Sequence, residues 1–248
     1  MKLDLRVLQI DLARQKENIP FVKKYIDVAK KWGYNYVLFY LENAVRTEDT
    51  LFFDKEETYS MDEMREMIDY AHSVGIEIIP AFENLGHLEK FFDYEQFHEF
   101  SEITDITKEG RAFYSHPRGA DGCVSNEKLN KFMDKYISDV ASLFSSPYIH
   151  MGLDEPWDFA ICDRCKERIK NGETKKDIFR KHILHTYELA KKLGKRMMMW
   201  DDFFEYADVS KDLQAKGMKF VGSTIIYSYL QAIGIIYSHD KECYLYKK

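Results

Sequence analysis

Short apolar runs typical of buried β-strands alternate along this chain with longer segments of helical periodicity. This alternation predicts parallel strands joined by helical crossovers, and it constrains the fold more than any other feature of the sequence. The runs expected to form strands are residues 3–10, 36–41, 76–82, 147–155, 195–200 and 219–227. The sequence therefore predicts an α/β fold built on a parallel sheet.

Four long helices are expected between these strands, with recognisable start and stop signals. Asn18 opens a helical pattern that Gly33 closes, and Ser60 begins a capping box whose helix ends at Gly75. The other two helices are expected within residues 126–144 and 174–193. Because no Gly/Ser-rich linker or change in composition divides the chain, we expect residues 1–248 to form a single domain.

Acidic residues stand at the carboxyl ends of five expected strands. They are Asp11, Glu42, Glu83, Glu155 and Asp202. In a (β/α)8 barrel all strand ends share the rim that carries the active site, whereas an open sheet gathers only some of them at a switch point. No GxGxxG or P-loop motif follows a strand, which argues against the usual dinucleotide and NTPase sites. We therefore predict a fold of the TIM-barrel type.

The length of 248 residues is close to the roughly 250 of a complete (β/α)8 barrel. Long segments at residues 83–125 and 155–173 use part of this length, so only six strands are clear and residues 243–246 form at best a seventh. We expect the barrel to be incomplete at its C-terminus, after about residue 230. Open strand edges could then pair with another copy of the chain, which predicts a homo-oligomer.

Charge and hydropathy restrict the partners and the compartment. With 36 Lys and Arg against 42 Asp and Glu, the net charge is −6, and the absence of a basic tract argues against nucleic acid. No run approaches the roughly 18 apolar residues that cross a bilayer, so no membrane partner is expected. Charges within residues 1–6 occupy the place of a signal peptide's apolar stretch. We expect a cytoplasmic protein.

The cysteines favour a reducing compartment over a disulfide framework, because there are only four in a chain of this length. Cys162 and Cys165 have zinc-knuckle spacing, but no second such pair follows them. Cys123 could supply a third ligand only if the fold brought it close. A redox CxxC is disfavoured because the pair does not follow a strand. We therefore favour free thiols and expect no metal.

The stretch from His150 to Glu155, His-Met-Gly-Leu-Asp-Glu, carries the strongest chemical signal. His150, Gly152 and Asp154 share one face of a strand, which in a barrel points inward, where polar groups are costly unless they serve a site. If the pleat breaks at the strand's end, Asp154 and Glu155 can reach one pocket. Adjacent carboxylates repel each other, which favours a proton on one of them and suits a general acid. The alternative is that Asp154 caps the next helix while Glu155 is solvated.

Other polar and aromatic residues fall near the same strand ends. Arg14 follows the first strand and can hold sugar hydroxyls with its fork of donors, and His87 lies a few residues after the third. Trp200 and Asp202 place an aromatic face beside an acid, a pairing suited to a pyranose ring. Each residue alone could be a surface charge, a loop residue or core. Their shared location favours a binding site.

These segments resemble family 20 of the glycoside hydrolases, the β-N-acetylhexosaminidases. The stretch from His150 to Glu155 is similar to the family's His-x-Gly-Gly-Asp-Glu motif, and residues 11–14 resemble its Asp-x-x-Arg. Residues 79–87 resemble a strand-three segment that ends in Gly-His. Residues 40–43 and 200–204 look like the corresponding segments of the bacterial cytoplasmic branch. The resemblance is ordered and spans residues 3 to about 205.

The resemblance implies retaining hydrolysis of terminal β-linked N-acetylhexosamine, GlcNAc or GalNAc, in which the substrate's N-acetyl oxygen attacks and an oxazolinium intermediate forms. Glu155 would then be the general acid and base, and Asp154 would orient the acetamido group. Arg14 would bind hydroxyls and Trp200 would wall the acetamido pocket. His87 and His150 would support the carboxylates through hydrogen bonds. No metal or cofactor is implied, and the partner is a small saccharide or glycoconjugate.

The chain departs from the family pattern at several positions. Leu153 replaces the second glycine of the motif, and Ala81 and Glu83 differ from the strand-three acids of the lysosomal type. No Trp occurs after Trp200, where the family has one near the end of strand six, so Tyr227 or Tyr229 is the candidate substitute.

Two other functions stay open. A carbohydrate-binding remnant would keep the acids without turnover. A glycosidase with a protein nucleophile would need a second carboxylate roughly 5 Å from Glu155, for which the candidates are Glu83, Glu42 and Asp202.

Overall fold

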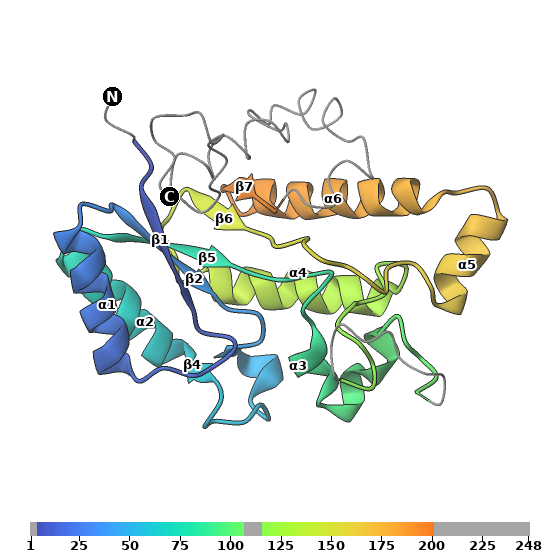
Figure 1. Ribbon diagram of the computed structural model, residues 1–248, viewed down its shortest axis with the longest axis horizontal. Coiled ribbons are helices and arrows are strands. Elements are labelled where there is room, and N and C mark those ends of the chain that lie inside the picture. The colour runs from blue at the N-terminus through green and yellow to red at the C-terminus, as the bar shows by residue number, and fades with distance from the viewer. Residues whose placement is uncertain (1–3, 107–115, 201–248) are drawn as a thin grey trace, which may run out of the picture.

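A five-stranded parallel sheet is the centre of the computed structural model, which describes residues 4–106 and 116–200 (Figure 1). Its strands are β1 (Val7–Asp11), β2 (Tyr36–Tyr40), β5 (Glu77–Ala81), β6 (Tyr148–His150) and β7 (Arg196–Met198). They pair in the order β1-β2-β5-β6-β7, which is also their order along the chain. Pairing in chain order, without the reversal of a doubly wound sheet, is that of a barrel. The predicted TIM-barrel type is confirmed.

The four predicted long helices are present as crossovers between the strands. They are α1 (Ile19–Lys31), α2 (Met61–Ser73), α4 (Glu127–Ala141) and α6 (Lys175–Lys192). Asn18 caps α1 by accepting a hydrogen bond from the Phe21 amide at 2.9 Å, and Ser60 and Glu63 form the capping box of α2. Figure 1 shows α1 and α2 side by side at one end of the sheet, and α4 and α6 along the other.

Several short elements lie in the connections that follow the strands, where the sequence shows little periodicity. They are β3 (Val45–Arg46), β4 (Tyr59–Ser60), α3 (Glu89–Phe92), α5 (Asp163–Lys170) and the 3₁₀ turns η1 (Glu48–Thr50) and η2 (Glu95–Phe100). β3 and β4 pair in parallel. We call residues 83–125 the insertion and residues 151–162, between β6 and α5, the rim loop. Both segments leave carboxyl ends of strands.

The two faces of the sheet bury different sets of side chains. Val37 and Phe39 of β2 belong to the large core formed with the helices, whereas Leu38 and Tyr40 belong to a second cluster on the opposite, inner face. This alternation follows from the two-residue period of a strand. The inner face is therefore the side that a barrel encloses, and residues that continue its period past the strand ends face the rim.

Aromatic rings pack the insertion against its neighbours. Phe91 meets Phe53, Phe97 and Tyr136 in T-shaped, edge-to-face contacts, and the ring centroids of Phe97 and Phe132 on α4 are 4.7 Å apart. Such contacts add to the burial of apolar surface and hold the described part of the insertion as a packed unit.

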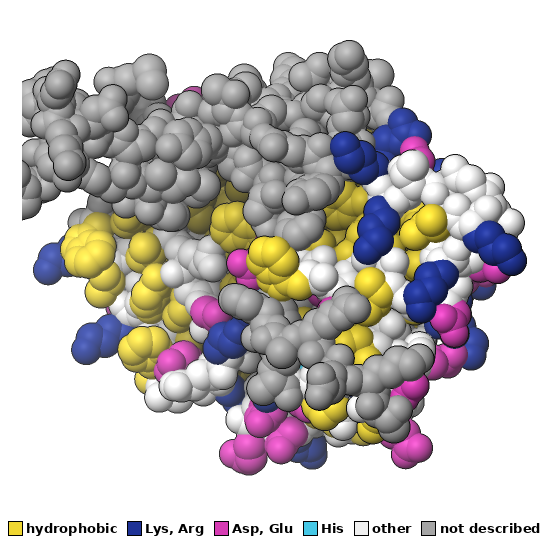
Figure 2. Space-filling view, turned by 45° about the vertical axis from the view of Figure 1, so that its right-hand side comes forward, with side chains coloured by type: hydrophobic (Ala, Val, Ile, Leu, Met, Phe, Trp, Pro, Cys, Tyr) yellow, Lys and Arg dark blue, Asp and Glu magenta, His cyan; other side chains and the backbone are white. Residues whose placement is uncertain are grey.

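The expectations for the C-terminal part fall on residues 201–248, outside the described residues. They are the strand at 219–227, the partial strand at 243–246 and the incomplete closure. Within the described part, no helix has the length and apolar character to cross a bilayer. Figure 2 shows basic and acidic side chains bordering one face of the molecule, with hydrophobic side chains scattered between them.

Candidate active site

Contacts between charged side chains connect the strand ends on the inner side of the sheet. Arg14, after β1, forms an ion pair with Glu42, which follows β2. Its Nη2 atom lies 3.3 Å from Nδ1 of His87, which follows β5. Because arginine only donates, Nδ1 of His87 accepts this hydrogen bond. The Asp11 carboxylate fixes the turn by accepting from the amides of Ala13 and Arg14 at 2.9 and 3.0 Å.

Both predicted catalytic carboxylates lie beside the other nitrogen of His87. Nε2 is 3.4 Å from Oδ2 of Asp154 and 3.7 Å from Oε2 of Glu155. The Asp154 side chain is 18% exposed and that of Glu155 is 42% exposed. One group is therefore mostly enclosed while its neighbour is open to solvent, which suits different roles for the two acids.

A break in the strand brings the two adjacent acids to one place. β6 ends at His150, and Gly152, Leu153 and Glu155 have φ angles of 65°, 77° and 46°. These left-handed conformations end the alternation of sides that a strand imposes, as the sequence analysis required. The alternative prediction, that Asp154 caps the next helix, is wrong, because that helix, α5, is capped by Cys162.

Left-handed backbone is concentrated around this group of residues. Five described residues other than glycine have positive φ, and four of them are Glu42, His87, Leu153 and Glu155. Such conformations cost about 1–3 kcal/mol each and persist where the surrounding structure imposes them, often at functional sites. The backbone geometry thus supports the same location that the charged contacts indicate.

Glu83 lies beneath the two acids. Its carboxylate packs against Gly152, where a Cβ atom would overlap the carboxyl oxygens. It is fully buried, and neither of its oxygens has a hydrogen-bond partner among the described residues. Burial, and then the charge of Asp154, raise the pKa of Glu83 well above its ordinary value. Burial and the neighbouring charge therefore favour the protonated form of Glu83.

The groups around Glu83 carry different charges. Burial raises the pKa of Glu42 to about 7, although the ion pair with Arg14 opposes this shift. For Asp154, burial is outweighed by the hydrogen bond and charge of His87, so the pKa of Asp154 is lower than usual. Asp154 is therefore ionised at neutral pH, next to Glu83, whose surroundings favour the protonated form.

His150 and Trp200 lie together on the inner side. Their ring centroids are 4.7 Å apart, and the Trp200 amide donates to the Gly152 carbonyl at 3.0 Å. Nδ1 of His150 accepts from the Gly152 amide at 3.1 Å, and burial lowers the pKa of His150 to about 4. The structure gives His150 this backbone contact in place of the predicted hydrogen bond to the acids. It supports the turn that carries them.

The geometry weakens the alternative of a protein nucleophile. The side chains of Glu42 and Glu83 are enclosed, with 1% and 0% of each residue exposed, so neither can reach a sugar bound at the rim. The third candidate, Asp202, and the predicted substrate-binding residues Tyr227 and Tyr229 lie outside the described residues.

Three residues near the acids were not predicted from the sequence. Tyr40 lies under the Arg14 guanidinium, 5.6 Å from it, and Trp157 is 51% exposed two residues after Glu155. Asp121 accepts a hydrogen bond from the Asp158 amide and so ties the insertion to the rim loop. Only Trp157 had a sequence signal, namely an aromatic residue just behind an acid pair.

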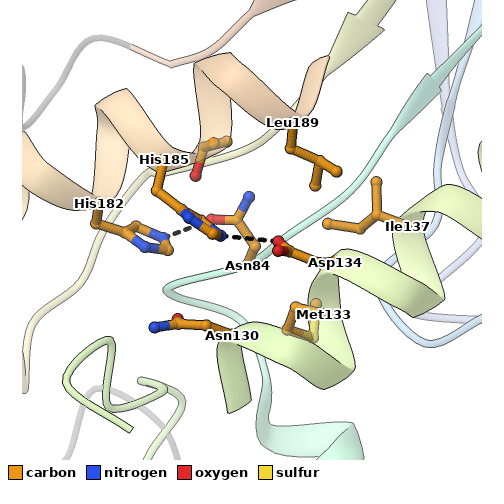
Figure 3. A pocket seen from close by; sticks show the side chains of 9 residues that line it. Asn84, Asn130, Met133, Asp134, Ile137, His182, His185 and Leu189 are labelled. Atoms are coloured by element: carbon orange, nitrogen blue, oxygen red, sulfur yellow. Dashed lines mark hydrogen bonds and ion pairs between the residues drawn. The ribbon is translucent and has the colours of Figure 1, made fainter. Parts of the chain in front are cut away.

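A separate pocket lies between α4 and α6, on the helix side of the sheet (Figure 3). His182 points from α6 to Asn84, with Nε2 and Oδ1 2.8 Å apart, and His185 points to Asp134 of α4 at 2.8 Å. Burial lowers the pKa of His182 to about 3. A neutral His182 thus holds the residue that follows Glu83, which makes this pocket a support for the site.

One group of described residues could hold a metal, and it contains none of the strand-end residues. It consists of Glu102, Cys123, Cys162 and Cys165. Cys123, expected to be a third ligand only if the fold brings it close, does lie beside Cys162 and Cys165.

Comparison with known proteins agrees with the resemblance in the motifs. The model of the family described as glycosyl hydrolase family 20, catalytic domain, matches residues 35–247. The chain is 30% identical to a β-hexosaminidase of Vibrio furnissii over 178 residues, which are 69% of this chain and 26% of that protein. It is 26% identical to β-hexosaminidase 1 of Coccidioides posadasii over 63% of this chain and 27% of that protein. The chain thus spans about a quarter of the length of these curated relatives.

The fold is also that of solved structures. The exo-β-N-acetylglucosaminidase of Vibrio harveyi in complex with N-acetylglucosamine superposes with a TM-score of 0.65 and 22% identity, over 80% of this chain and 35% of that one.

The packing of Glu83 against Gly152 predicts that Gly152→Ala destabilises the protein more than Gly194→Ala. Both glycines have similar positive φ angles, 65° and 71°, but a Cβ at residue 194 meets nothing within 4 Å. We expect Gly194→Ala to lower the free energy of unfolding by about 1 kcal/mol, and Gly152→Ala to lower it by about 2 kcal/mol more than that. Urea unfolding at neutral pH measures both, and equal losses would contradict the tight packing.

The buried His182 predicts an acid-sensitive contribution to stability. Between its folded pKa of about 3 and the unfolded value of about 6.5, only the unfolded chain binds the proton, so stability falls as the pH falls. When the pH falls from 7 to 5, we expect the free energy of unfolding of the wild type to decrease by about 2 kcal/mol relative to that of His182→Gln. His185→Gln is the control. Because the hydrogen bond to Asp134 raises the pKa of His185, the wild type should gain stability relative to this variant as the pH falls. Urea unfolding at both pH values tests this, and parallel changes in all three proteins would refute it.

Proposed function

The chain belongs to glycosyl hydrolase family 20, and from this premise we propose that it is a retaining exo-β-N-acetylhexosaminidase. Its substrate would be a short sugar chain or glycoconjugate that ends in β-linked GlcNAc or GalNAc. What supports the substrate class is the family and the names of the relatives, which are β-hexosaminidases.

One observation carries the mechanism. Asp154 and Glu155, adjacent in the sequence, both lie within 4 Å of Nε2 of His87, and the carboxylates deeper in the site are enclosed. With these two acids on the same side of the site, the described residues offer no accessible carboxylate to attack the sugar from the opposite side. A nucleophile within the substrate itself fits this arrangement, as in the substrate-assisted members of this class of enzymes.

In the first step, the acetamido carbonyl oxygen of the substrate forms a bond to the anomeric carbon as the glycosidic C–O bond breaks. Glu155 gives its proton to the leaving oxygen, and the product sugar departs as an alcohol. Asp154, which is ionised, accepts a hydrogen bond from the acetamido N–H and stabilises the positive charge of the oxazolinium ring.

In the second step, water attacks the anomeric carbon and the bond to the acetamido oxygen breaks. Glu155 takes the proton from the water and returns to its starting state. Two inversions at the same carbon give net retention. His87, held by Arg14, positions both carboxylates through these steps.

The remaining residues would hold the terminal sugar. Arg14, whose side chain is 46% exposed, can bind hydroxyls while Glu42 fixes its direction. Trp200, beside His150, would form the wall of the acetamido pocket. For Asp202, Tyr227 and Tyr229 we keep the substrate-binding role that the sequence predicts.

We also propose that the chain belongs to the bacterial cytoplasmic branch of the family. The resemblance of residues 40–43 and 200–204 supports this, as do three buried cysteines that lie close together without a disulfide. Pairing with a second copy of the chain stays a prediction. Detection of the native protein in fractionated cells tests the compartment, and its presence in the secreted fraction would contradict the proposal.

The proposed chemistry predicts that the protein cleaves a chromogenic N-acetyl-β-glucosaminide but not the matching β-glucoside, which lacks the internal nucleophile. We expect kcat to fall by about 10²–10⁴-fold in Glu155→Gln, because general acid–base catalysis is lost. Asp154→Asn should lower kcat as well, since the charge beside the oxazolinium is lost. Steady-state kinetics measure these effects. Glu66→Gln on α2, an exposed carboxylate paired with Lys23, is the control.

The other functions give different results. Equal cleavage of both glycosides would indicate a protein nucleophile. Binding of N-acetylglucosamine without cleavage, measured by calorimetry, would indicate a carbohydrate-binding remnant. A thiazoline analogue of the oxazolinium should inhibit competitively only if the substrate-assisted mechanism holds.

A further inference from the structure

Three thiols and one carboxylate meet inside the protein, away from the rim. Sγ of Cys123 is 3.1 Å from Sγ of Cys162 and 3.8 Å from Sγ of Cys165, and Sγ of Cys165 is 3.2 Å from Oε1 of Glu102. All four ligand atoms lie within 4.8 Å of one another, and each residue is at most 3% exposed. We propose that this cluster, named here the Cys₃Glu cluster, is a structural zinc site.

The geometry fits a tetrahedral ion. With a zinc–sulfur distance of about 2.3 Å and a zinc–oxygen distance of about 2.1 Å, two sulfurs stand about 3.8 Å apart and a sulfur and an oxygen about 3.6 Å apart. The Cys123–Cys162, Cys123–Cys165 and Cys165–Glu102 distances lie within about 0.7 Å of these values, so small side-chain rotations bring the four atoms around one ion. Four protein ligands leave no open position, which is typical of structural zinc.

The surroundings orient the ligands. The amides of Ile161 and Cys162 donate to Oε2 of Glu102 at 2.9 and 2.7 Å, which leaves Oε1 directed at the sulfurs. The Cys165 amide lies 3.5 Å from Sγ of Cys162 at the start of α5, where the helix favours a thiolate. Hydrogen bonds that fix the ligands from outside are usual at metal sites.

A positive charge also reaches the edge of the cluster. Oγ of Ser125 is 3.1 Å from Sγ of Cys165 and accepts a hydrogen bond from Arg168 at 2.9 Å. Three thiolates and a carboxylate exceed the charge of Zn²⁺, and the nearby Arg168, which also pairs with Glu173, reaches the cluster only through the Ser125 hydroxyl. Buried charged groups are generally paired or coordinate a metal, and thiolates with tetrahedral geometry select zinc among the common divalent ions.

The site would join two parts of the active-site rim. Glu102 and Cys123 belong to the insertion, while Cys162 and Cys165 stand at the end of the rim loop and the first turn of α5. The rim loop carries Asp154 and Glu155. The metal would therefore fix the loop of the proposed catalytic acids without contacting the substrate.

The wild-type protein, purified as the full chain under reducing conditions, should contain one zinc per chain by elemental analysis. Removal of zinc by a chelator should lower the melting temperature by about 10 °C or more, and added zinc should restore it. Cobalt substitution should give the intense charge-transfer absorption of a thiolate-rich tetrahedral site. A protein that neither contains zinc nor binds added zinc or cobalt would overturn the proposal, as would a different metal in the purified chain.

Variants test the ligands. Cys123→Ser, Cys165→Ser and Glu102→Gln should each lose zinc, and the cysteine variants should weaken the cobalt charge-transfer band. The matched controls are Cys243→Ser, the remaining cysteine of the sequence, and Asp163→Asn, an exposed acid of α5. Both should retain zinc. Loss of zinc in a control, or its retention in Cys123→Ser, would overturn the assigned ligands, and the spectra of the cobalt-loaded wild type decide the matter if a variant does not fold.

Discussion

The contact of His87 with both Asp154 and Glu155 is the interaction on which the proposed site depends, and it requires three local features at once. β5 and β6 must be parallel neighbours, so that the segments leaving them start at the same edge. The backbone after β6 must turn into left-handed conformations, or the two acids would point to opposite sides. Arg14 must hold the far nitrogen of the imidazole, which links β1 to the pair. Because these features involve β1, β5 and β6 together, the site exists only once the sheet has formed.

The position of Glu83 against Gly152 explains how the neighbouring carboxyl groups of Glu83 and Asp154 can differ in charge. Burial beside the ionised Asp154 favours a proton on Glu83, which avoids a second buried charge, and the missing Cβ of Gly152 leaves room for the Glu83 carboxyl group. The sequence motif contains the glycine and the acids, but Glu83 comes from another strand end. The motif from His150 to Glu155 therefore depends on a residue almost seventy positions earlier in the chain.

Much of this could be predicted from the sequence, for physical reasons. Apolar runs and capping residues such as Asn18 and Ser60 are local signals, so the four long helices and five strands lie close to their expected places, although β6 ends at His150, earlier than expected. Acids after successive strands had to meet at one edge once the sheet was parallel, which located Glu42, Glu83 and Glu155. The contact of His150 with the Gly152 amide depends on how the backbone turns after β6, and the approach of Cys123 to Cys162 depends on tertiary packing. Sequence spacing shows neither contact: Cys123 could be named as a third ligand beside the CxxC pair, but nothing indicated that it would lie close or that Glu102 would join it.

The proposed acids are thus held from two sides. On one side, β6 and the Gly152 turn fix Asp154, with His150 and Trp200 behind the turn. On the other, the rim loop is tied to the insertion by the Asp121–Asp158 hydrogen bond, by Glu102 and by the three thiols. A loop fixed at both ends loses less conformational entropy when the acids take their catalytic geometry, because most of that entropy was already lost during folding. In this arrangement the insertion acts as the second anchor of the proposed active site, and its packed aromatic rings give that anchor its rigidity.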